Sequence, residues 1–166
     1  MPTRKSVDLT HRGGMLFSAA PSSGHALAFD DRESNQGGSP VETVLSALGS
    51  CSAMDVISIV EKKRQAVTGY EVHVTGSQRD EYPQVFTEIE VVHEVTGTDL
   101  SEAAIRRAVE LSATKYCPVN AMLSAGATVV HHRYRIHSSG AAPYEAEGEV
   151  IATGPYARPD VIAEPG

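Results

Sequence analysis

Residues 37–56 read GGSPVETVLSALGSCSAMDV and have the parts of a long helix. Ser39 is a suitable cap, Pro40 suits the first helical position, and Glu42 stands where a capping box places its carboxylate. Apolar side chains then recur around much of the circumference, which is typical of a helix that is buried centrally. The pattern predicts a helix from Ser39 to about Arg64.

Working outward, the flanking segments alternate in ways that indicate strands. Before the helix, glycine- and proline-rich turns divide three short segments that predict an antiparallel ribbon: Ser6–Thr10, Met15–Ala19 and His25–Asp30. After it, alternation predicts a hairpin of two strands joined by polar residues: Tyr70–Ser77 and Val85–Val95. A helix over Asp99–Tyr116, with Asp99 and Glu102 as a capping box, a short helix over Pro118–Ser124 and a strand over Ala127–His137 complete the pattern.

The last part of the chain has a different composition. From Ser138 onward, Gly, Ala, Pro and Glu predominate, so residues 138–166 are predicted to be a loosely ordered tail, although Glu149–Thr153 could add an edge strand. Residues 1–137 are predicted to form one domain, because 166 residues with 41% hydrophobic content can build one ordinary core.

Charge and hydropathy limit the partners. The formal net charge of −7 argues against non-specific electrostatic binding to nucleic acid or to an anionic membrane, since binding to either requires clustered Lys and Arg. We find no apolar run of signal-peptide length and no stretch near the roughly 18 to 20 apolar residues that span a bilayer. We therefore expect a cytoplasmic protein with small-molecule or protein partners.

The chain has two cysteines, Cys51 in the long helix and Cys117 just before Pro118. In a reducing cytosol such thiols are catalytic, metal-binding or merely buried. Cys51 also fits a small buried hydrophobe, and Cys117 fits an ordinary helix start. No close Cys-Cys or Cys-His spacing supports zinc at either thiol.

The seven histidines give a weak metal signal. His131 and His132 are adjacent on a predicted strand and point to opposite faces, so they are poorly placed to share an ion. His73 and His93 are expected to be cross-strand neighbours on a solvent face. We predict no metal and no cofactor.

Residues 37–56, followed 66 positions after Cys51 by Cys117-Pro118-Val119-Asn120, resemble the OsmC/Ohr family of osmotically inducible and organic-hydroperoxide-resistance proteins. The resemblance covers roughly Met15 to His137, and it is specific because the two motifs occur together and in this order. It implies an α+β fold in which two protomers intertwine, with central helices between antiparallel β-sheets and two active sites at the homodimer interface.

The resemblance also implies a chemistry. Cys51 would be the peroxidatic thiol and Cys117 the resolving thiol, the substrate an organic hydroperoxide, and the reductant an external dithiol, for which lipoylated proteins are the family precedent. A thiolate attacks the peroxide oxygen, and the resulting sulfenic acid condenses with a nearby thiol. The helix start and Lys115 are expected to favour the thiolate of Cys117.

The family's glutamate and arginine, which assist the reactive thiolate, are harder to locate in this sequence. The peroxidase branch of the family has a glutamate directly after the motif proline, where this chain has Val41, and its own Glu42 comes one residue later. On a straight helix Glu42 lies opposite Cys51, so a cap is its simpler role. Arg12, or else Arg32, is the candidate for the arginine that polarises the thiolate. A non-enzymatic member that binds a small apolar ligand at the dimer interface is the alternative function.

Overall fold

The computed structural model describes residues 3–150, and these divide into two compact units, one ending at Val44 and the other beginning at Leu45. The first unit holds a three-stranded antiparallel sheet in the order β1-β2-β3. Its strands are β1 (Val7–Gly13), β2 (Leu16–Pro21) and β3 (Leu27–Phe29). All three predicted strands of the ribbon are therefore present.

The turn between β1 and β2 depends on glycine. Gly13 and Gly14 have φ values of 109° and 55°, and both lie in the region that side chains disfavour. After β3 the chain returns alongside it, because Gly38 N–H donates to the Ala28 carbonyl over 3.0 Å. At Gly37 a Cβ atom would meet the Ala28 backbone at 2.7 Å, so this close approach requires glycine.

The long helix forms as predicted. Helix α1 (Pro40–Lys62) begins with proline at its first position, and the Ser39 carbonyl accepts a hydrogen bond from Thr43 N–H over 3.0 Å. It ends two residues before the predicted limit, at Lys62, where Arg64 turns the chain with a φ of 55°.

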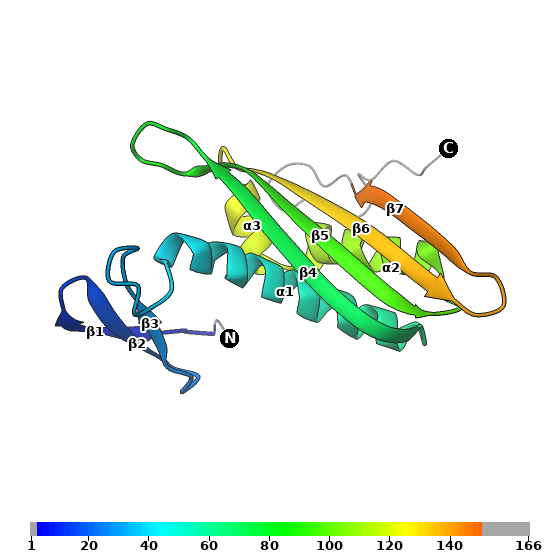
Figure 1. Cartoon of the computed structure of the whole chain (residues 1–166), viewed down its shortest axis with the longest axis horizontal. Coiled ribbons are helices and arrows are strands. Elements are labelled where there is room, and N and C mark those ends of the chain that lie inside the picture. The colour runs from blue at the N-terminus through cyan, green and yellow to red at the C-terminus, as the bar shows by residue number, and fades with distance from the viewer. Residues whose placement is uncertain (1–2, 151–166) are drawn as a thin grey trace. The chain divides into compact units, whose positions relative to one another are not determined.

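The second unit is built on a four-stranded sheet in the order β4-β5-β6-β7 (Figure 1). The strands are β4 (Ala66–Gln78), β5 (Phe86–Thr98), β6 (Val129–Ser139) and β7 (Tyr144–Val150). The β4–β5 and β6–β7 pairs are antiparallel, whereas β5 and β6 are parallel. The parallel pair requires a crossover, which α2 (Glu102–Leu111), a π-helical turn (Ser112–Tyr116) and α3 (Pro118–Ser124) supply.

The helices cover one face of this sheet (Figure 1). Inward-facing side chains of β5 and β6 alternate with outward-facing ones and pack against α1 and α2. The fully buried centre of the unit is apolar and consists of Val56, Val60, Val95, Ile105, Ala108, Val109 and Ile136. This packing fixes the positions of α1 and α3, which carry the cysteines.

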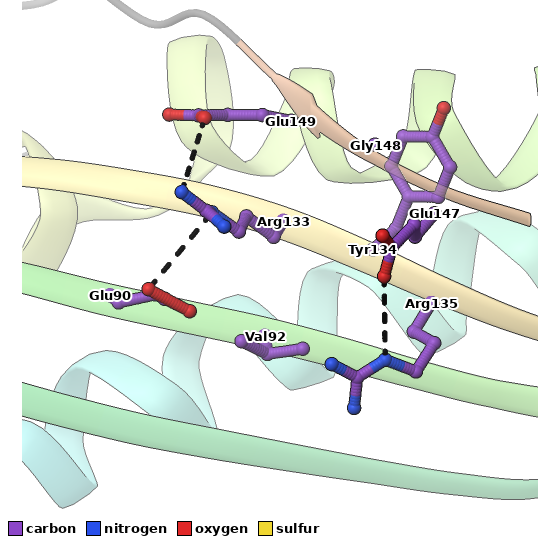
Figure 2. Close-up of a pocket in the computed structure, with 8 residues that line it drawn as sticks. All are labelled: Glu90, Val92, Arg133, Tyr134, Arg135, Glu147, Gly148 and Glu149. Atoms are coloured by element: carbon purple, nitrogen blue, oxygen red, sulfur yellow. Dashed lines mark ion pairs between the residues drawn. The ribbon is translucent and has the colours of Figure 1, made fainter.

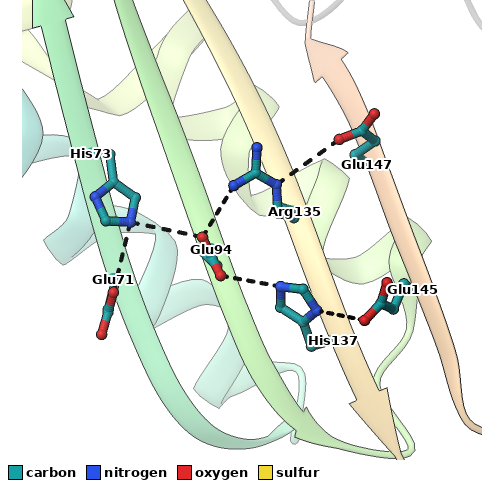
Figure 3. Close-up of polar contacts among 7 residues, drawn as sticks. All are labelled: Glu71, His73, Glu94, Arg135, His137, Glu145 and Glu147. Atoms are coloured by element: carbon teal, nitrogen blue, oxygen red, sulfur yellow. Dashed lines mark hydrogen bonds and ion pairs between the residues drawn. The ribbon is translucent and has the colours of Figure 1, made fainter.

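The opposite face of the sheet is a ladder of charges. Arg133 on β6 lies between Glu90 at 4.0 Å and Glu149 at 3.6 Å, beside a shallow pocket (Figure 2). His137 lies between Glu94 and Glu145, at 3.1 Å from each (Figure 3). Glutamates on β5 and β7 thus flank the basic and histidine side chains of β6.

The structure corrects two expectations about secondary structure. The loose tail from Ser138 is instead ordered through β7, whose Val150 is buried, while residues 151–166 lie outside the described part of the chain. The capping box at Asp99 does not form, because Ser101 caps α2 by accepting from Ala104 N–H over 3.3 Å. Asp99 has a φ of 48° and accepts from Ala141 N–H instead.

Helix α1 also corrects the expectation on membrane-spanning length. Among the described residues it is the one helix long and apolar enough to cross a bilayer, with a mean hydropathy of 1.6 over its most apolar window. Only 28% of that window is buried within the single chain. Core helices of soluble proteins meet the same criterion, and here the sheet covers one side of α1 (Figure 1).

Candidate functional site

The structure brings the two cysteines together. Cys51 lies on α1, and Cys117 is the N-cap of α3, close enough to Cys51 for that residue to raise the pKa of the Cys117 thiol. Both are free thiols, Cys51 partly buried and Cys117 only 3% exposed. One member of the pair is thus accessible to a small molecule while the other lies behind it.

The environment of Cys117 keeps its thiol protonated. Burial raises the pKa of the thiol to about 12, and Cys51 raises it further, outweighing the lowering effect of the Asn120 N–H that donates to Sγ over 3.3 Å. The expected help from Lys115 is wrong, because its exposed amino group lies over the ring of Tyr116, 5.3 Å from the centroid. At neutral pH the Cys117 thiol is therefore protonated.

A buried hydrogen-bond chain lies beside the thiols. Tyr70 OH lies 2.7 Å from His93 Nδ1, and His93 Nε2 lies 3.2 Å from Ser52 Oγ. Ser52 continues to Ser112 over 3.0 Å, and Ser112 donates to Asp55 Oδ2 over 3.0 Å. Because a carboxylate only accepts, the direction is set: each group donates toward Asp55.

This series of hydrogen bonds ends close to Cys51, the accessible thiol. Asp55 follows Cys51 by four residues on α1, so both lie on the same side of the helix. Burial raises the pKa of Asp55, and the hydrogen bond from Ser112 partly offsets that effect. The carboxyl group of Asp55, with its raised pKa, therefore lies one helical turn from Cys51.

A second buried histidine approaches from β6. His132 stacks on His93 with ring centroids 6.1 Å apart, and its Nε2 lies 2.9 Å from Asn120 Oδ1. Burial lowers the pKa of His93 to about 3 and that of His132 to about 4, so both rings are neutral at pH 7. Among residues 3–150, His132 Nδ1 is the buried side-chain atom that lacks a hydrogen-bond partner.

Sequence reasoning missed these groups and misplaced one of them. His93 is fully buried on the helix-covered face, opposite Val72 in the register, and is not beside His73 on the solvent face. The burial of His93 could have been inferred from the alternation along the strand, since His93 is two residues from both Val91 and Val95 and so faces the same side of the sheet. His131 and His132 do point to opposite faces, as predicted.

The other predicted site residues lie in the first unit. Arg12 is on β1, exposed, with its Nε donating to Ser18 Oγ over 2.8 Å. Arg32 is in the loop after β3, and Glu42 is in the first turn of α1. Their roles toward Cys51 stay predictions. Over residues 3–150, we find no three His, Cys, Asp or Glu side chains grouped to hold a metal ion.

Comparison with known proteins gives a consistent result. The profile of the family described as OsmC-like protein matches residues 33–132. Protein YhfA of Escherichia coli strain K12 is 45% identical over 118 residues, which is 71% of this chain and 88% of that relative.

Solved structures share the fold. A hypothetical protein from Aquifex aeolicus VF5 superposes with a TM-score of 0.73 at 29% identity, over 83% of this chain and 99% of that one. The organic hydroperoxide resistance protein OhrB of Bacillus subtilis superposes with a TM-score of 0.52 at 16% identity, over 82% and 98%, which is a likeness of fold alone. With its paired thiols, its α+β architecture and this profile match, the chain belongs to the OsmC/Ohr family of OsmC-like proteins.

Proposed function

We propose that this protein is a thiol-dependent peroxidase that reduces organic hydroperoxides to alcohols. The observation that carries the proposal is that the partly buried Cys51 lies close enough to the buried Cys117 to raise the pKa of its thiol. Two thiols in contact, one accessible and one protected, are what a cycle of oxidation and disulfide closure requires. Family membership adds support, as does the fold shared with the organic hydroperoxide resistance protein OhrB of Bacillus subtilis.

The proposed cycle has three balanced steps. The Cys51 thiolate attacks the terminal peroxide oxygen, the O–O bond breaks, and the alkoxide takes a proton and leaves as the alcohol. The Cys51 sulfenic acid then condenses with the Cys117 thiol, whose proton leaves with the hydroxyl group as water. An external dithiol, such as a lipoylated protein, reduces the disulfide by two thiol–disulfide exchanges.

The surroundings of Cys51 favour an organic substrate. Ala47, Leu48 and Met54 lie three or four residues away on α1, and so flank the thiol. Met54 is 69% exposed in the single chain and offers apolar surface to a substrate carbon chain. In this scheme Arg12 polarises the thiolate, as the family resemblance implies, while Glu42, one residue after the family's glutamate position, has the simpler role of a helix cap.

A homodimer is part of the proposal. Exposed apolar side chains on both units, among them Leu9, Met15, Met54 and Met122, leave much apolar surface without cover in one chain. A second copy that packs its helices against α1 would bury that surface. A reducing, cytoplasmic location fits two thiols that must return to the free state in each cycle.

The alternative is a non-enzymatic protein that binds a small apolar ligand between the protomers. Val41, which replaces the glutamate of the peroxidase branch, is the observation that favours it. Under this alternative the thiols would turn over slowly or not at all.

The experiment is a consumption assay with cumene hydroperoxide and a dithiol reductant. We expect catalytic loss of peroxide with the parent protein, slower turnover of hydrogen peroxide, and no turnover with Cys51→Ser, since a neutral hydroxyl is a poor nucleophile. Parent and Cys51→Ser consuming the peroxide equally would favour the ligand-binding alternative.

A further inference from the structure

Asn120 supplies a hydrogen-bond donor for a carbonyl group that has no backbone N–H partner. The π-helical turn sends Cys117 N–H to the Ser112 carbonyl over 3.0 Å. The next carbonyl, that of Ala113, would by the same spacing accept from residue 118, but Pro118 has no N–H. The Ala113 carbonyl is buried and needs another partner.

The Asn120 side chain fills that need. Its Nδ2 donates to the Ala113 carbonyl over 2.7 Å, which fixes the carboxamide so that Oδ1 faces His132. Since Oδ1 can only accept, His132 Nε2 carries the hydrogen and Nδ1 is bare. The neutral state of the buried His132 agrees with this tautomer.

The same asparagine holds the thiol. Its backbone N–H donates to Cys117 Sγ over 3.3 Å, and Asn120 is 4% exposed and His132 fully buried. One residue thus ties the thiol, the π-helical turn and strand β6 together. The hydrogen bonds of both side chains go to the Ala113 carbonyl and to each other, so their influence falls on Cys117.

We propose that Asn120 and His132 form a brace that holds Cys117 against Cys51 for disulfide closure, acting as positioning residues for the resolving step. The order of steps rests on the proposed function, but the brace itself concerns the Cys51–Cys117 bond whatever oxidant forms it. In the closure step the Cys117 sulfur bonds to the Cys51 sulfur, and the departing hydroxyl leaves as water with the thiol proton. The preceding attack of Cys51 on peroxide does not require the brace.

The test separates the two steps. In stopped-flow experiments with cumene hydroperoxide, Asn120→Ala and His132→Phe should slow disulfide closure at least about 10-fold, because each leaves a buried polar group unpaired at the brace. Formation of the Cys51 sulfenic acid should change less than about 2-fold. Over-oxidised Cys51 should accumulate, as the sulfenic acid waits for its partner.

A second readout needs no peroxide. In mixtures of oxidised and reduced dithiothreitol, the equilibrium constant for the Cys51–Cys117 disulfide should fall at least about 10-fold in both variants. If the parent consumes no peroxide, the proposed function fails while this equilibrium still tests the brace. If Asn120→Ala does not fold, His132→Phe carries the same test.

Two matched variants control for structure. His132→Gln keeps a donor in a side chain of similar reach and should restore closure to within about 3-fold of the parent. Ser124→Ala removes the hydroxyl that donates to the Asn120 carbonyl over 2.7 Å, on the same short helix, and should leave closure unchanged. Unchanged closure and equilibrium in folded His132→Phe, equal losses in both steps, or a parent that forms no intramolecular disulfide would overturn the brace.

Discussion

At the scale of single residues, burial decides the state of the groups around the thiols. A helix N-terminus favours a thiolate at Cys117, yet burial raises the pKa of this thiol to about 12. The same effect keeps His93 and His132 neutral. Local sequence shows neighbours along the chain but does not show depth, so these states could not be predicted from it.

The buried histidines predict how stability depends on pH. Their pKa values in the folded protein, about 3 and about 4, lie below the unfolded value of 6.5, so below pH 6.5 the unfolded chain binds more protons. Stability should therefore fall as the pH drops from about 6.5 toward about 4, by up to about 1.4 kcal/mol per pH unit for each histidine. Half-buried His137 has a pKa raised by its hydrogen bonds with Glu145 and Glu94, and it acts weakly in the opposite direction.

Urea unfolding at fixed protein concentration, at about pH 6 and about pH 5, measures this slope. His132→Gln removes one of the two titrating groups, so its stability should change less with pH than that of the parent. An unchanged slope in His132→Gln would show that His132 does not titrate in the way its burial implies.

At the scale of elements, α1 packs on β4 at a glycine. A Cβ atom at Gly49 would lie 2.7 Å from Val74 Cγ2, and valine is too stiff to move aside cheaply. Gly49→Ala should lower the free energy of unfolding by about 1 to 2 kcal/mol, because overpacking outweighs the gain in helix propensity.

Chemical unfolding measures the effect, and Gly126→Ala is the matched control. No heavy atom lies within 4 Å of a Cβ atom built at Gly126, so that substitution should be close to neutral. Equal stability of the two variants would contradict the close packing of α1 on β4.

Some helices and strands could be predicted from the spacing of apolar residues, and others could not. The long helix, the hairpin and the short helix at Pro118 followed from apolar spacing and from Pro and Ser at the helix start. Strand β7 did not, because its outward glutamates and Gly148 hide the alternation and its pairing with Arg133 and Arg135 is a tertiary effect. The parallel β5–β6 pair and the π-helical turn are likewise set by packing between distant segments.

At the scale of the whole molecule, the candidate site was predicted in part. The cysteine pair came from two motifs 66 positions apart, and the structure places them in contact. The polar groups behind them did not emerge, because Ser52, Ser112 and His132 are ordinary residues until the fold gathers them.

The proposed homodimer predicts the size of the molecule in solution. Sedimentation at micromolar concentration should give a dimer, and Met54→Lys should weaken it by placing a charge on the exposed apolar side of α1. Thr96→Lys, on the exposed side of β5, should leave the dimer intact. A stable folded monomer of the parent would contradict the proposed assembly.

Intact mass spectrometry after one equivalent of organic hydroperoxide tests the central claim, that Cys51 attacks and Cys117 resolves. The parent should lose two hydrogens as the disulfide forms, Cys117→Ser should gain one oxygen as a trapped sulfenic acid or a higher oxide, and Cys51→Ser should show neither change. A parent without a Cys51–Cys117 disulfide, or two serine variants that consume peroxide as fast as the parent, would contradict the account.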